Sequence, residues 1–117
     1  MPISNLEDTI VGILENVDII PYPIVAPHDA VTPCVVYQRI STFPLRSHEG
    51  YVIGRSRWQL SCYAHERNEV LELADTVRAA FDLNQIDFEL STAESEIETV
   101  DADSGLYRQI LDFQIWK

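Results

Sequence analysis

The stretch Arg57–Phe81, RWQLSCYAHERNEVLELADTVRAAF, holds the pattern around which the rest of the chain can be arranged. Its first eight residues alternate strictly between apolar and polar side chains, which predicts a half-buried strand because successive strand side chains point to opposite faces. The apolar side of this strand is Trp58, Leu60, Cys62 and Ala64. After residue 65 the apolar spacing changes to three and four, which predicts a helix over 66–82. The apolar face of this helix is Val70, Leu73, Ala74, Val77 and Phe81. Strand and helix can therefore cover each other, and neither carries catalytic chemistry.

Length and composition indicate one domain spanning residues 1–117. The chain is 46% apolar, with a formal net charge of −11 and a pI of about 4.4. A chain of this size buries an ordinary core on folding. Its negative charge disfavours binding to nucleic acid and to anionic membranes. The acidic N-terminus lacks the basic region of a signal peptide, and no apolar run approaches the roughly 18 residues of a membrane span. We therefore expect a soluble protein made in the cytoplasm.

The charge is unevenly spread along the chain. Residues 82–103 contain eight acids and no base, whereas residues 34–67 contain five arginines and two acids. A chain with one acidic and one mildly basic segment can pair with copies of itself or with a partner. The alternative is an acidic solvated face with scattered arginines.

Two elements are predicted before the central strand. Apolar residues spaced by three and four predict a helix from Ser4 to Asn16. Residues 19–33 contain four prolines, which lack the amide donor and bias the preceding residue away from helix. This segment is expected to be an extended connection along the surface.

A hairpin with a long tip is predicted next. The β-branched and aromatic run Cys34–Ser41 predicts a strand that pairs with the strand at Arg57. Residues 42–55 between them are expected to form a long hairpin loop with an extended or flexible tip. Hairpin tips are normally two to five residues, so a tip of this length indicates either disorder or a function, and its apolar character favours contact with another surface. The candidate interface residues are Phe43, Leu45, Arg46, Tyr51, Val52, Ile53, Arg55 and Arg57.

The C-terminal third predicts a second hairpin. The alternation of residues 86–91 breaks, which indicates a bulge or irregular segment before a strand at Glu94–Val100. Asp101–Gly105 is a turn, and Leu106–Trp116 is the last strand. The expected order is α-β-β-α-β-β. This order predicts an α+β domain with one mainly antiparallel sheet and two helices packed on one face.

No residue pattern indicates catalysis or a bound cofactor. The pair His48–Glu49 in the long loop is the best acid–base candidate, but no nucleophile or orienting group stands at recognisable spacing. The other histidines, His28 and His65, are distant in sequence, so no metal site is expected. Cys34 and Cys62 lie in apolar strand patterns and are interpreted as buried free thiols; a disulfide between neighbouring strands is possible but not implied.

Five acids near the second hairpin form a candidate acidic surface: Glu94, Glu96, Glu98, Asp101 and Asp103. They lack the spacing of a calcium-binding loop. A solvated or lumen-facing surface is the stronger interpretation.

Several segments together resemble one family. In chain order they are TPCVVYQ (32–38), WQLSCYA (58–64), LADTVRAA (73–80), DSGLYR (103–108) and LDFQIW (111–116). Their order and spacing are similar to those of the tail-completion family of long-tailed bacteriophages, and the similarity covers nearly the whole chain. Members of this family act as tail terminators or tail-to-head joining proteins.

The resemblance implies a structural virion protein and not an enzyme. It implies a homo-oligomeric ring, typically of six copies, on the head-proximal end of the tail tube. Such a ring is assembled in the host cytoplasm, ends tube polymerisation, and contacts the tail tube protein and the head connector or stopper protein. DNA passes through the ring without specific binding. Two alternatives stay open: a small non-catalytic ligand-binding or regulatory module, and an enzyme that uses His48 and Glu49.

Overall fold

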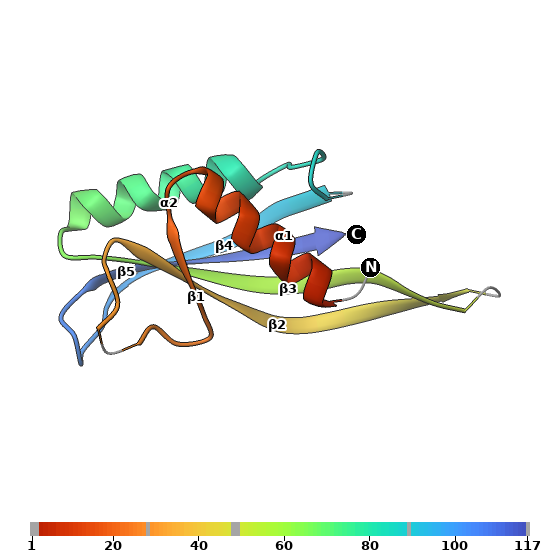
Figure 1. Cartoon of the computed structure of the whole chain (residues 1–117), viewed down its shortest axis with the longest axis horizontal. Helices are drawn as coiled ribbons and strands as arrows, with labels where there is room; N and C mark the ends of the chain where they lie inside the picture. Colours follow the sequence, from red (N-terminus) through yellow and green to blue (C-terminus); the bar gives the residue numbers. More distant parts are fainter. Residues whose placement is uncertain (1–2, 28, 48–49, 89, 117) are drawn as a thin grey trace.

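The structure, a computed structural model, describes residues 3–27, 29–47, 50–88 and 90–116. It is an α+β fold, as predicted, with two helices and one five-stranded sheet of order β1-β2-β3-β5-β4 (Figure 1). In chain order the elements are α1 (Ile3–Asn16), β1 (Ile20–Pro23), β2 (Cys34–Ser47), β3 (Gly50–Ala64), α2 (Arg67–Phe81), β4 (Leu90–Val100) and β5 (Tyr107–Trp116). Within the described residues, no helix is long and apolar enough to cross a membrane.

The strand and helix formed by Arg57–Phe81 lie at the centre of this fold. The four apolar residues of β3 from Trp58 to Ala64 are each at most 2% exposed, and α2 buries Val70, Ala74, Val77 and Phe81. The alternate residues of β5, Leu111, Phe113 and Ile115, join the same core cluster. The Phe81 ring lies 5.6 Å from that of Phe113 and 6.2 Å from that of Phe88, centroid to centroid. The predicted strand and helix are therefore confirmed, and each covers the other.

The segment expected to be only an extended connection contains a strand. Ile20–Pro23 pairs in parallel with Cys34–Tyr37, so the sheet is mixed and the element order has one strand more than predicted. The prolines of this segment, including Pro21 and Pro23, predict an extended connection and not a paired strand. β1 is an edge strand, however, and a proline there need not donate to a ladder on its outer side.

The predicted long loop at residues 42–55 is wrong, because strand pairing continues through it to Ser47 opposite Gly50. Two register shifts allow this: Ile40 is an extra residue on β2, and Gly54 is an extra residue on β3 opposite Phe43 and Pro44. Bulges tolerate the proline and glycine that indicated a loop in the sequence. We call the two-stranded extension formed by residues 42–47 and 50–54 the arm.

The second hairpin is longer than predicted. β4 begins at Leu90 and not at Glu94, and the expected parity break is a register shift between Ala93 and Ser95. The turn at 101–105 is as expected, with Gly105 at φ +73° and its amide donating to the Asp101 carbonyl at 2.8 Å.

The helices are held differently. The backbone of α2 lies closest to β3, β4 and β5, whereas the backbone of α1 lies closest to β1 and α2. On α1, the Glu7 carboxylate accepts a hydrogen bond of 3.2 Å from the Tyr37 hydroxyl of β2. Burial, together with Glu7, raises the pKa of Tyr37.

Candidate interaction surfaces

The arm carries most of the candidate interface residues. Six of the eight lie in its paired strands, between Phe43 and Ile53, while Arg55 and Arg57 stand at its base and are half-buried. β5 pairs with β3 only from Arg55 onward, so the arm extends past the sheet. Six residues in strand conformation reach about 20 Å. The whole molecule is accordingly elongated, at 51 × 24 × 23 Å, and Figure 1 shows the arm projecting from one end.

The arm has open strand edges. Within the described residues, β1 pairs with β2 only as far as Tyr37, and β3 before Arg55 pairs only with β2. Unpaired strand edges present rows of amide and carbonyl groups that readily pair with another chain. The arm therefore offers a partner the backbone groups along these edges.

The polar side of β3 continues onto β5. Arg57, Gln59 and Tyr63 are half-buried, whereas Ser61 is buried. Ser61 pairs with Ile110 of β5, and Ile110 pairs with Ile97 of β4. The Ile97 residue is 56% exposed. This side of the sheet mixes uncharged polar and aliphatic residues, which are typical of both protein contacts and partly solvated sheet faces.

The structure separates the five acids of the candidate acidic surface. Glu98 accepts from Arg67 on α2, with 2.6 Å between Oε1 and Nε, and Glu96 accepts from Arg78. Hydrogen bonds from these arginines lower the pKa of both carboxylates. Glu96 and Glu98 reach these arginines because the register shift at Ala93/Ser95 turns both carboxylates toward the side of the sheet on which α2 packs. Pairing thus reduces the free negative charge of the predicted surface.

The remaining three acids make local contacts. Glu94 accepts from the Thr92 hydroxyl at 2.8 Å. Asp101 accepts from the Asp103 amide at 3.3 Å and from the Ser104 hydroxyl at 2.8 Å, which stabilises the turn. Asp103 is exposed.

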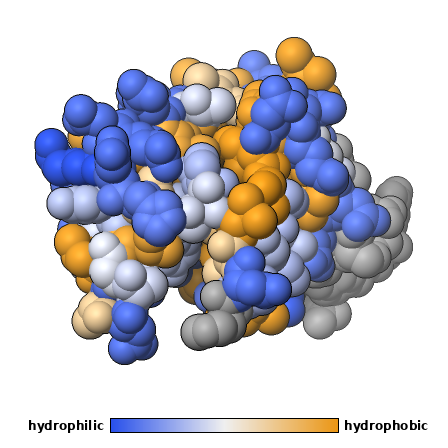
Figure 2. Space-filling model, turned by 60° about the vertical axis from the view of Figure 1, so that its left-hand side comes forward, coloured by the Kyte–Doolittle hydropathy of each residue, from blue (hydrophilic) through white to orange (hydrophobic). Residues whose placement is uncertain are grey.

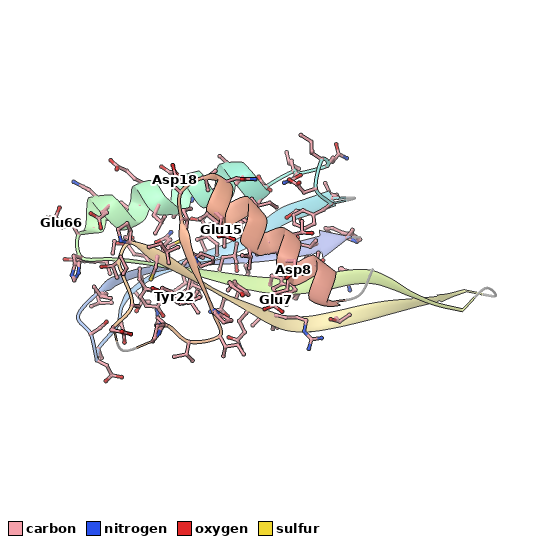
Figure 3. The ribbon with its side chains drawn as sticks, viewed as in Figure 1. Glu7, Asp8, Glu15, Asp18, Tyr22 and Glu66 are labelled. Atoms are coloured by element: carbon pink, nitrogen blue, oxygen red, sulfur yellow. The ribbon has the colours of Figure 1, made fainter. Side chains whose placement is uncertain are left out.

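A further acidic stretch follows α1. Glu7, Asp8, Glu15 and Asp18 lie along this helix and just past its end (Figure 3). Their spacing is visible in the sequence, although the acidic run at 82–103 is denser. Figure 2 shows hydrophilic residues on both sides of a band of hydrophobic ones on the face that it presents. This face therefore alternates hydrophilic and apolar patches.

The described residues bring no catalytic set together. His48, Glu49 and His28 lie outside the described residues, and His65 is exposed. No group of three possible metal ligands occurs among the residues that the structure covers.

The two cysteines are free and buried. Cys34 pairs with Tyr63, and Cys62 with Val35, so the thiols occupy neighbouring rows and point to opposite faces of the sheet. Burial raises the pKa of both, that of Cys62 to about 12. Neither thiol is activated as a nucleophile.

What the described residues provide is a projecting arm, open strand edges and alternating charged and apolar patches on a small α+β domain. These are the features of a structural protein that works by contact with other proteins. Residues 22–117 match the model of the family described as tail completion protein gp17, and the chain belongs to this family of bacteriophage tail proteins. A search of curated proteins found no match. Family membership makes the chain a structural component of the phage tail, as the sequence resemblance predicts.

Proposed function

We propose that this chain forms a homo-oligomeric ring, of six copies, on the head-proximal end of the phage tail tube. The ring ends tube polymerisation and joins the tail to the connector or stopper protein of the head. The observation that carries this proposal is the arm of a domain that belongs to the tail-completion family. Within the described residues, the two strands of the arm pair only with each other beyond Arg55, and a ring of copies or a neighbouring ring can supply a further partner.

Both helices cover one face of the sheet in this proposal, and the face with Arg57 and Gln59 is turned toward an assembly partner. The arm residues, with Arg46 and Arg55, dock on protein and not on nucleic acid. The net charge of the chain supports contact with protein and not with nucleic acid. A chain of formal charge −11 repels phosphates, so DNA slides through the ring without specific binding.

The acidic surface near the turn is proposed to face the lumen. Glu94, Asp101 and Asp103 are the members that no arginine engages in the described contacts, so they contribute most of its free charge. Repulsion between carboxylates and the DNA backbone keeps the passage open.

Sedimentation velocity of the full chain, alone and mixed with purified tail tubes, tests the proposal. Ring formation predicts a discrete closed oligomer, with tube ends acting as the nucleus if the isolated chain stays monomeric. A chain that remains monomeric and fails to bind tube ends contradicts the proposal. A ligand-binding module would instead respond to a small molecule with a thermal shift and show no affinity for tubes.

A further inference from the structure

The loop between α2 and β4 presents apolar side chains to solvent. Ile86 is 95% exposed and Leu83 is 69% exposed, which are high values for large aliphatic residues. Phe88, two residues after Ile86, is buried and stacks on Phe81 of α2. The loop is thus anchored in the core while its two aliphatic side chains project outward.

The backbone of this loop is held in place by specific hydrogen bonds. Leu83 adopts a left-handed conformation at φ +57°, which is costly for a residue with a branched side chain. Its amide donates to the Ser91 carbonyl at 2.6 Å. The Asn84 side chain accepts from the amides of Ile86 and Asp87, both at 3.0 Å, and donates to the Ala80 carbonyl at 2.9 Å. The exposed pair is therefore displayed on a fixed support.

A hollow of about 570 Å³ lies between this loop and the end of α1. Its apolar walls are Ile13, Val17, Ala79, Ala80, Leu83 and Ile86. Asp82 and Asp87 also line it, and Glu15 and Asp18 flank the lining residues Asn16 and Val17 in sequence. The hollow is thus an apolar site with an acidic rim.

We propose that this hollow is the docking site for the arm of a second copy of the chain. The sequence from the start of the arm to Arg55 at its base, residues 42–55, has the complementary composition: it is rich in aliphatic and aromatic residues and contains Arg46 and Arg55 against a single acid, Glu49. The apolar residues of this segment can contact Leu83 and Ile86, while its arginines lie against the acidic rim. The segment therefore matches the hollow in both apolar character and charge. The inference rests on the proposed ring, whose subunit contact it specifies.

The contact is heterologous, because the arm and the hollow are different surfaces of one chain. The base of the arm lies at Arg55, whereas the hollow is built from α1, α2 and the 82–88 loop. A head-to-tail contact of this kind produces a closed ring when its rotation closes. Each copy then donates one arm and receives one.

Crosslinking across copies tests the contact directly. A photoreactive benzoylphenylalanine replaces Ile86, and equal amounts of light and ¹⁵N-labelled chain are mixed under conditions where the chain is oligomeric, with tail tubes added where the isolated chain is monomeric. Trypsin releases the arm as peptides 40–46 and 47–55, because cleavage follows Arg39, Arg46 and Arg55. Mixed-isotope crosslinks from position 86 to either peptide are expected. Crosslinks confined to other segments, in a sample that is oligomeric, overturn the docking site while leaving the ring intact.

A substitution pair supplies a second readout. Ile86→Asp adds a charge to the apolar wall and is expected to weaken self-association by about tenfold or more, as for a buried contact at the centre of an interface. Val31→Asp is the matched control, because Val31 is 58% exposed and its backbone amide, not its side chain, donates a hydrogen bond to the Tyr22 hydroxyl. Equal self-association of Ile86→Asp and Val31→Asp contradicts the inference. If the wild-type chain stays monomeric both alone and in the presence of tail tubes, the proposed function is contradicted as well.

Discussion

Arg55 of β3 pairs with Trp116 of β5, and this pair marks the end of the five-stranded sheet and the start of the arm. On one side of it, β3 has neighbours along both edges; on the other, β2 and β3 have only each other among the described residues. The arm is therefore built as an extension of the two strands that also carry the core. A contact made by the arm is transmitted to a rigid support, because the same β3 backbone continues into Trp58 and Leu60.

Charge reversal in the arm should block assembly without unfolding the domain. Arg46→Glu combined with Arg55→Glu places two carboxylates where the proposed partner surface is acidic, so tail joining should be lost. The control is Arg39→Glu, which reverses one exposed arginine outside the arm and is compared with Arg46→Glu alone, so that the change in net charge is equal. Joining is measured as infectious particles formed on mixing tails and heads, and folding by circular dichroism. Joining at the wild-type level by the arm variant would refute the role of the two arginines.

The buried pair Trp58 and Ser56 predicts a stability effect. The Trp58 indole donates to the Ser56 hydroxyl at 2.9 Å, and both residues are buried. Ser56→Ala leaves the indole N–H without this acceptor and should lower the free energy of unfolding by about 1–3 kcal/mol in urea titrations. Combining it with Trp58→Phe should give a loss smaller than the sum of the single losses. Additive losses would show that the bond does not matter.

The pair of Glu96 and Arg78 predicts a pH dependence. Arg78 lowers the pKa of Glu96 from 4.5, so the contribution of Glu96 to stability is full above that value and is lost as the pH falls through its lowered pKa. At neutral pH, Glu96→Gln should cost about 1 kcal/mol or less, because both partners are partly exposed. The difference from wild type should vanish in acid. The control is Glu94→Gln, whose carboxylate accepts from Thr92 and not from an arginine. A difference in the free energy of unfolding between wild type and Glu96→Gln that persists unchanged in acid would be inconsistent with this pairing.

Both thiols should resist modification in the folded protein. Cys34 and Cys62 are at most 1% exposed, and burial raises the pKa of each. Since the thiolate is the reactive form, a disulfide reagent at pH 8 should label neither cysteine natively and both in strong denaturant. Rapid labelling of either thiol in the native state would show that its strand opens.

Much of the fold followed from periodicity. The strand from Arg57 to Ala64, the helix that ends at Phe81 and the alternation of β5 were predictable because each buries one regular face against the others. The register shift in β4 was foreseen as a break in parity, although its consequence for Glu96 and Glu98 was not. Which side of a strand a carboxylate occupies after a bulge depends on the position of the extra residue, and several positions fit the same sequence.

The arm and β1 were missed for a related reason. Pro44, Gly50 and Gly54 indicate a loop by local preference, as Pro21 and Pro23 do for the earlier segment. The structure accommodates these residues at a bulge, a strand end or a sheet edge, where no ladder hydrogen bond is required of them. Whether a strand can contain these prolines and glycines depends on how the neighbouring strand pairs with it. The local sequence does not specify that pairing. The hollow beside Ile86 was unpredicted likewise, because it requires α1 and the 82–88 loop to come together.

The proposed role of the chain is to close the tail tube and prepare it for the head. Electron microscopy of particles from cells infected with phage that lack this protein tests this role, with wild-type protein supplied from a plasmid as the control. Overlong or headless tails are expected without the protein, and normal particles are expected on complementation. Tails of normal length attached to heads in its absence would show that the protein does not have this role.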